Sequence, residues 1–166
     1  MSIQPIRLFG DPVLTTPASP VIDFDKELRT LVKDLTDTML EAPGAGLAAP
    51  QIGVPLRVFV WDIDDALGHL INPTLDLSDE MQEGEEGCLS FPLLALRITR
   101  PEEIDVEYQD FNGVKRTAKY TGISARCFQH ELDHMNGIVY TCVAKPLALK
   151  FGTERRKKMM KKLRLK

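Results

Sequence analysis

The chain has 166 residues, 43% of them hydrophobic and 27% charged, which is enough for one well-packed domain and too little for two of ordinary size. Its 11 glycines and 11 prolines are close to average usage, and no apolar run approaches the roughly 20 residues that cross a bilayer, which excludes disordered, collagen-like and membrane-spanning proteins. The net charge of -3 is unevenly distributed, because residues 151–166 carry eight lysines and arginines against Glu154 alone.

Hydrophobic periodicity predicts the elements of the first half of the chain. Residues 25–40 have the apolar spacing of an amphipathic helix, which Pro43 and Gly44 end. The β-branched and aromatic residues 57–61 predict a buried strand, and residues 69–71 predict a second, shorter one. Six of the eleven residues 76–86 are acidic, so we expect a solvated loop or an irregular edge there.

The second half begins with a predicted hairpin. Two runs in which apolar and polar residues alternate, residues 104–108 and 114–120, flank Asn112-Gly113. Asn-Gly between two such runs is the strongest short hairpin signal. Residues 124–136 have a helical pattern, with Ser124 as N-cap and Gly137 as stop. A last helix covers much of residues 147–165. The predicted fold class is therefore α+β: antiparallel β-sheets around a central helix, with an N-terminal amphipathic helix and a C-terminal basic helix. We expect one catalytic domain over residues 1–150, followed by a basic helix or tail over residues 151–166.

The central helix carries a candidate metal site. His130 and His134 are four residues apart, so both imidazoles lie on one helix face and can ligate one metal ion. Glu131 projects to the side, where it can take a proton from a metal-bound water that attacks a polarised carbonyl. This pattern also occurs in helices that bind no metal, but the cap and stop residues that frame it favour a metal site.

A catalytic tetrahedral metal site has three protein ligands and a fourth position that is open for water, so a third ligand is needed besides the two histidines. The extended metalloprotease pattern fails, since Tyr140 stands where it requires a histidine. Cys127 shares the helix face of His130, whereas Cys88 comes from a separate segment and would leave the open position free, so geometry favours Cys88. For Cys142 we expect a core thiol. Three cysteines without a visible export signal indicate reduced thiols and a cytoplasmic protein.

Three segments together carry a family resemblance. Residues 44–51 combine two glycines with small residues, which permit close backbone approach along an extended peptide or in a tight turn. With residues 86–90 and 130–134, they occur in the order and spacing of the three motifs of the peptide deformylase family, which the sequence resembles over most of its length to about Tyr140. The resemblance implies a hydrolase that removes the N-formyl group from the initiator methionine of newly synthesised proteins and releases formate.

The resemblance also implies the role of each motif residue. One divalent metal ion, Fe(II) in most such enzymes with Zn, Ni or Co tolerated, would have as its ligands Cys88, His130 and His134. The donor set alone would suit zinc, so the iron assignment rests on the resemblance. Glu131 would act as general base and then as proton donor to the leaving amine. The side-chain amide of Gln51 and the backbone N–H of Leu89 would stabilise the oxyanion.

Substrate binding is implied in the same way. The peptide would add as a strand opposite backbone groups of the enzyme, and the methionine side chain would enter an apolar pocket beside the helix of His130. The residues at these positions are Ala45, Gly46, Gly87, Ile123 and Cys127. Ala45 is smaller than the residue common in the family, and residues 93–96 are more apolar than usual. We expect Arg100 to pair with Glu86 and to have Asp133 as a further partner.

The basic tail has two interpretations, a solvated helix end or a helix that contacts rRNA on the ribosome. The expected partners are therefore N-formylmethionyl nascent peptides and the ribosome, with no membrane partner, and we expect a monomer.

Two alternative functions are a general metallopeptidase and a non-catalytic metal-binding or ribosome-associated module that kept the fold. Every motif position that the chemistry needs carries a suitable residue in this sequence, which disfavours the non-catalytic module.

Overall fold

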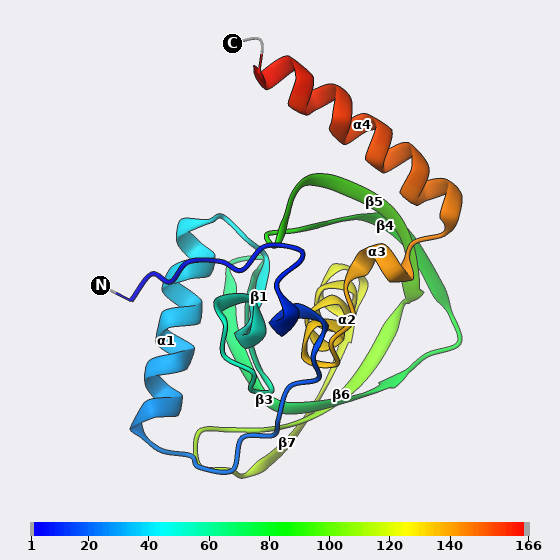
Figure 1. Ribbon diagram of the computed structural model, residues 1–166. Coiled ribbons are helices and arrows are strands. Elements are labelled where there is room, and N and C mark those ends of the chain that lie inside the picture. Colours follow the sequence, from blue (N-terminus) through cyan, green and yellow to red (C-terminus); the bar gives the residue numbers. More distant parts are fainter. Residues whose placement is uncertain (1, 165–166) are drawn as a thin grey trace.

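Helix α2 (Gly122–Met135) lies between two antiparallel β-sheets, as the computed structural model, which describes residues 2–164, shows (Figure 1). The five strands of the larger sheet are, in spatial order, β1 (Gly46–Ala48), β2 (Val58–Ile63), β3 (Ala66–Leu77), β6 (Glu103–Gln109) and β7 (Lys115–Thr121). The two strands of the smaller sheet are β4 (Met81–Cys88) and β5 (Phe91–Pro101). The predicted α+β class, with antiparallel sheets around a central helix, is confirmed.

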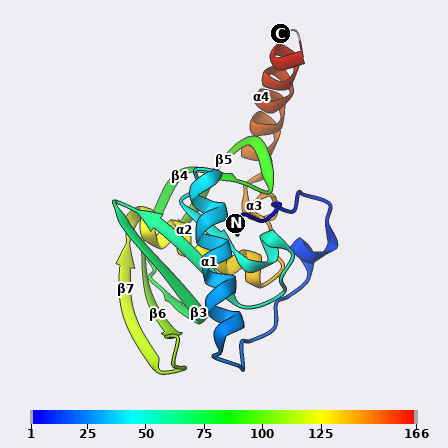
Figure 2. The same cartoon turned by 90° about the vertical axis from the view of Figure 1, so that its left-hand side faces the viewer.

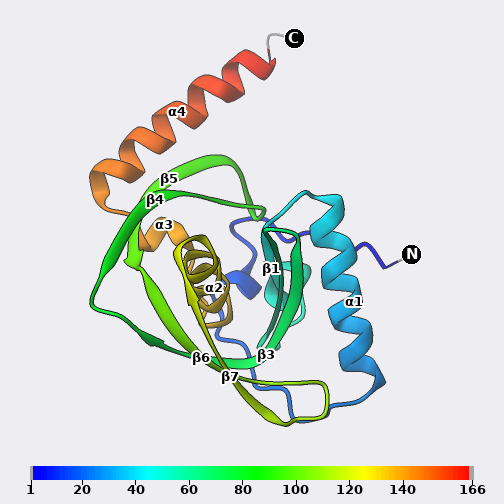
Figure 3. The same cartoon turned by 180° about the vertical axis from the view of Figure 1, so that it is seen from behind.

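Helix α1 (Lys26–Glu41) covers the larger sheet on the side away from α2 (Figure 3). The side chain of Asp25 caps the helix by accepting a hydrogen bond of 3.0 Å from the N–H of Leu28. The apolar side of the helix packs on β1 and β2 in a fully buried cluster that includes Leu35, Met39, Leu47, Val58 and Val60. The predicted N-terminal helix is confirmed.

The strands agree with the sequence patterns in one region and differ in another. The predicted hairpin is confirmed, since β6 and β7 pair around a turn in which Gly113 has a φ of +74°. Of the two alternatives for residues 76–86, the solvated loop is wrong, because β3 extends to Leu77 and strand β4 begins at Met81. Strand β4 is an edge strand, and its pairing with β5 is irregular between Glu86 and Cys88. The inward-facing residues of β4 are Gln82, Gly84 and Glu86. Because none of them is apolar, the sequence lacks the alternation of apolar and polar residues that indicates a half-buried strand.

Helix α2 begins directly after strand β7, two residues earlier than predicted. Thr121 occupies the N-cap position without a side-chain hydrogen bond, so the prediction of Ser124 as N-cap is wrong. The predicted stop at Gly137 is confirmed: its φ is +72°, and Ile138 and Gly137 donate to the carbonyls of Asp133 and His134 at 2.8 and 3.2 Å. These two bonds form a Schellman motif, which ends the helix just after its second histidine.

Aromatic packing fixes α2 against the larger sheet. The ring of Phe128 lies edge-on to that of Phe59 on β2, with 5.2 Å between centroids, and 4.5 Å from that of Tyr120 on β7. Phe59 and Phe128 are fully buried in the second core cluster. The histidines of α2 are thereby held on the side that faces the smaller sheet.

The chain ends in two helices, α3 (Tyr140–Val143) and α4 (Pro146–Arg164), of which α4 extends away from the body (Figure 2). The last helix is thus present from Pro146, and the end of its predicted range, residue 165, lies outside the described residues. The prediction of Cys142 as a core thiol is wrong: it is exposed, because the single turn of α3 buries Tyr140 and turns Cys142 away. Within residues 2–164, no helix is both long and apolar enough to cross a membrane.

Candidate metal centre and active site

Three potential metal ligands converge from two elements. Cys88 lies at the end of β4, whereas His130 and His134 lie on α2, and their ligand atoms are all within 4.8 Å of one another. The Sγ atom of Cys88 is 3.3 Å from Nε2 of His134. An irregularity in the pairing of β4 with β5 between Glu86 and Cys88 accompanies this convergence. A thiol and two imidazoles at this spacing fit a divalent transition metal with an open coordination position.

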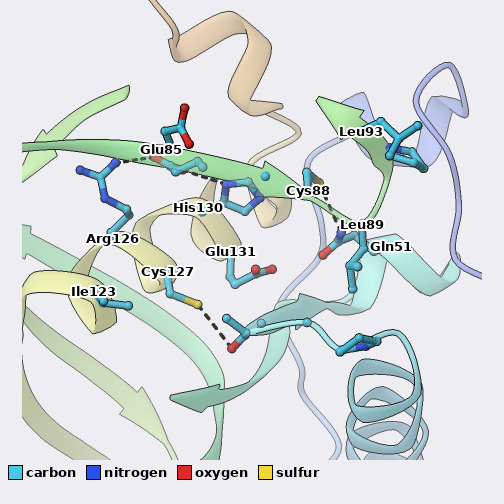
Figure 4. Close-up of a pocket in the computed structure, with 17 residues that line it drawn as sticks. Gln51, Glu85, Cys88, Leu89, Leu93, Ile123, Arg126, Cys127, His130 and Glu131 are labelled. Atoms are coloured by element: carbon cyan, nitrogen blue, oxygen red, sulfur yellow. Dashed lines mark hydrogen bonds and ion pairs between the residues drawn. The ribbon is translucent and has the colours of Figure 1, made fainter. Parts of the chain in front are cut away.

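The imidazole of His130 is oriented by a carboxylate (Figure 4). Its Nδ1 is 2.9 Å from Oε1 of Glu86, and because a carboxylate only accepts, Nδ1 carries the proton and Nε2 is left for a metal. The buried Nδ1 of His134 has no hydrogen-bond partner among the described residues. The two histidines are therefore held differently, and only His130 has a charged partner that fixes its ring.

Arg100 makes both contacts expected of it. Its Nε and Nη2 donate to the two carboxylate oxygens of Glu86 at 2.8 and 2.9 Å, and its Nη1 donates to Asp133 at 2.8 Å. Burial favours a raised pKa for Glu86, but the bonds from His130 and Arg100 outweigh it and lower that pKa to about 2. Glu86 is therefore ionised beneath the candidate metal site.

Glu131 lies on α2 with its side chain in the cavity (Figure 4). Its Oε2 is buried without a hydrogen bond in the part of the chain that the structure describes. The carboxylate lies so close to Gly46 that a Cβ atom there would be 2.7 Å from Oε1. Burial raises the pKa of Glu131 to about 7, so in the metal-free protein this carboxyl group exchanges its proton near neutrality. A buried, unpaired carboxylate of this kind is suited to proton transfer.

Gln51 is held rigidly at the other end of the site. Its Oε1 accepts from the N–H of Ala48 at 2.9 Å, and its Nε2 donates to the hydroxyl of Ser90 at 3.1 Å. The same Nε2 is 3.7 Å from the Sγ of Cys88, and Leu89 lies beside Gln51 in Figure 4. The side-chain amide of Gln51 therefore lies beside the three candidate ligands, with one of its N–H groups directed toward Cys88.

A cavity of about 500 Å³ joins these groups. Every predicted catalytic or substrate-binding residue lines it, namely Ala45, Gly46, Gln51, Gly87, Leu89, Ile123, Cys127 and Glu131. Cys88 and His130 also line the cavity, whereas His134 lies behind them, only 1% exposed. Ile123 is 68% exposed and forms part of the rim. Burial raises the pKa of the Cys127 thiol, which remains protonated 3.7 Å from the carbonyl oxygen of Ala45.

The sequence patterns assigned no role to two buried residues of this region, Arg126 and Ser90, although Ser90 lies within the motif of residues 86–90. Arg126 donates to Glu86 at 2.9 Å, and Ser90 accepts the bond from Gln51 described above. An arginine in an amphipathic helix usually lies in solvent. The only signal was its position four residues before His130, which places both side chains on one helix face.

Comparisons with known proteins agree on one family. The family model described as polypeptide deformylase matches residues 3–150. A peptide deformylase of Acidothermus cellulolyticus is 56% identical over 140 residues, which are 84% of this chain and 78% of the relative. The crystal structure of a peptide deformylase from Legionella pneumophila has a TM-score of 0.87 and 38% identity, covering 99% of each chain. That of Synechococcus elongatus, in complex with actinonin, has a TM-score of 0.86 and 36% identity, covering 92% of this chain and 85% of that one.

Proposed function

This chain belongs to the polypeptide deformylase family, and on that basis we propose that it removes the N-formyl group from the initiator methionine of newly synthesised proteins and releases formate. The observation that carries the proposal is the convergence of Cys88, His130 and His134 beside the unpaired carboxylate of Glu131, in a cavity that an extended peptide end can enter. A substrate on nascent chains would place the enzyme in the cytoplasm.

The donor set supports one divalent metal ion held by Cys88, His130 and His134. When bound, the metal supplies a Lewis acid that polarises the formyl carbonyl and lowers the pKa of water. We propose Fe(II) from the family resemblance, with zinc, nickel and cobalt as substitutes. The protonated thiol of Cys127 lies against Ala45 and takes no part in this set.

Glu131 serves as the general base and then as the general acid. Its free oxygen accepts a proton from the water that attacks the formyl carbon, and it delivers that proton to the amine nitrogen as the C–N bond breaks. The side-chain amide of Gln51 and the backbone N–H of Leu89 donate to the oxyanion that forms between these steps. Donors of this kind contribute roughly 3 kcal/mol each to the stability of a transition state.

The cavity wall provides the methionine site. The side chain lies against Ala45, Ile123 and Cys127, where the small Ala45 leaves extra room, and the peptide backbone pairs with exposed backbone at Ala45 and Gly87. Gly46 lies at the base of this site, where its lack of a side chain admits the carboxylate of Glu131. Leu93 at the rim makes the downstream end of the cavity apolar.

The catalytic domain is proposed to span residues 1–150, and the basic segment 151–166 to contact rRNA. Arg155 and Arg156 are engaged with the body, at 3.2 Å from Glu85 and 2.9 Å from the carbonyl of Pro92. Among the described residues of this segment, the exposed cations left for a partner are Arg164 and four lysines, namely Lys157, Lys158, Lys161 and Lys162. Reversing these four charges to glutamate should weaken sedimentation with ribosomes and leave turnover of a short formyl-Met peptide intact, as should truncation after Phe151. Unchanged association would contradict the rRNA contact.

The enzymatic proposal is tested with protein loaded with Fe(II) under anaerobic conditions and formyl-Met-Ala as substrate. Loaded protein should release formate, and protein stripped by a chelator should not. Glu131→Gln should keep the metal and lose about 10²- to 10⁴-fold in kcat, the usual contribution of a general base. Full turnover by that variant would exclude Glu131 from proton transfer.

A further inference from the structure

Arg126 lies one helical turn before His130 on α2, and its side chain is only 10% exposed. We propose that Arg126 is a positioning residue for the metal ligand His130, acting through the carboxylate of Glu86 that both side chains contact. The inference rests on the proposed function, because it assigns His130 to the metal. It adds a residue that the motifs of the sequence do not contain.

The hydrogen bonds of Glu86 are the first support. Its Oε1 lies 2.9 Å from both Nδ1 of His130 and Nη2 of Arg100. Its Oε2 accepts from Nε of Arg100 at 2.8 Å and from Nη1 of Arg126 at 2.9 Å. A carboxylate has about four acceptor positions, so Arg126 completes the set. With every position filled by a fixed donor, the oxygen that meets His130 is held in one place.

The balance of charge is the second support. Arg100 is shared between two carboxylates, since it also donates to Asp133 at 2.8 Å. One guanidinium between Glu86 and Asp133 would leave a negative charge uncompensated in the protein interior, which is costly. Arg126 provides the second guanidinium. The cluster beneath the metal site thereby has two cations for two anions.

The fixed position of the guanidinium is the third support. Nη1 of Arg126 also donates to the carbonyl of Ile98 on β5 at 2.9 Å. The planar group lies against Gly84 on β4, where an added Cβ would be 3.3 Å from its Nε, Cζ and Nη2 atoms. Figure 4 shows the side chain reaching from α2 toward β4. Lysine has neither the planar shape nor several donors at fixed angles, so it can replace the charge but not the geometry.

The test measures binding of Co(II) to metal-free protein by the visible absorption of the thiolate-bound ion, independently of turnover. Arg126→Met, which keeps the alkyl stem, should weaken Co(II) affinity by about 10-fold, the lower end of the range found when a direct partner of a metal-ligating histidine is removed, because Arg126 acts through Glu86. Arg126→Lys should lie between Arg126→Met and the wild type. As a matched control, Arg97→Met removes an arginine from β5 that is 64% exposed and pairs with Glu83, and it should bind Co(II) as the wild type does.

A double-mutant cycle separates positioning from general destabilisation. If Arg126 acts through Glu86, then Arg126→Met should change Co(II) affinity little in a Glu86→Gln background. Wild-type affinity in folded Arg126→Met, or full additivity with Glu86→Gln, would overturn the inference. If Arg126→Met does not fold, the Co(II) affinity of Arg126→Lys is measured alone and together with Glu86→Gln, and the same two criteria apply. Formate release by the wild type is scored separately, so failure of the proposed function would be distinguished from failure of this inference.

Discussion

Alanine at position 46 would place a Cβ atom 2.7 Å from Oε1 of Glu131 and 2.8 Å from Sγ of Cys127. Ordinary contact begins at 3.4 Å, so the carboxylate must move by about 0.7 Å, the difference between 3.4 and 2.7 Å. Strand β1 cannot easily retreat, because Gly46 is paired with Trp61 on β2 and α1 packs behind both strands. Since a displacement of about 1 Å in an active site costs on the order of 10²-fold in rate, we expect Gly46→Ala to lower kcat by about 10- to 100-fold.

The assay for Gly46→Ala is formate release from formyl-Met-Ala, with bound metal measured on the same sample. Metal content should not change, because the clash involves none of the three proposed ligands. Gly87→Ala is the control for folding and metal content, since a Cβ there meets nothing within 4 Å. Wild-type kcat in metal-loaded Gly46→Ala would refute the reasoning, because the carboxylate of the proposed general base would then tolerate displacement.

Three further substitutions test other parts of the account. Cys88→Ser should lose or greatly weaken metal binding while Cys127→Ala retains it, as measured by metal content after gel filtration; the opposite pattern would reverse the assignment of the two thiols. Gly152→Ala should destabilise the protein by roughly 1–3 kcal/mol through overpacking, seen as a lower Tm with unchanged Co(II) affinity. The reason is that a Cβ atom at position 152 would lie 2.4 Å from Cδ2 of Leu96 and 2.8 Å from the carbonyl oxygen of Ala95. An unchanged Tm would contradict this overpacking and show that α4 can shift on β5.

Local sequence patterns predicted the elements whose buried faces consist of apolar residues at regular spacing. Helix α1 and the β6–β7 hairpin follow from spacing and from Asn112-Gly113, because their buried faces are hydrophobic and their turn chemistry is specific. The pair His130 and His134 could be recognised for the same reason, as helical geometry fixes their separation. The choice of Cys88 as their partner required a contact between β4 and α2, for which the family resemblance was the stronger guide.

The rest depended on contacts between segments far apart in the sequence. Strand β4 is rich in acidic residues, and its buried Glu86 is balanced by Arg100 and Arg126 from two other elements. No local pattern indicates such compensation, so the sequence predicted a solvated loop or an irregular edge in place of the strand and assigned no role to Arg126. Cys142 was misplaced because a helix of one turn is too short for its buried side to be visible as a period.

The central claim is the chemical identity of the bond that is cleaved. The most direct measurement is product analysis of formyl-Met-Ala after incubation with the Fe(II)-loaded protein under anaerobic conditions. Deformylase activity predicts formate and Met-Ala in equal amounts, with no free alanine. Formyl-Met and alanine would instead indicate a metallopeptidase, and no product from a protein with a filled metal site would indicate a non-catalytic module; either result would contradict the account.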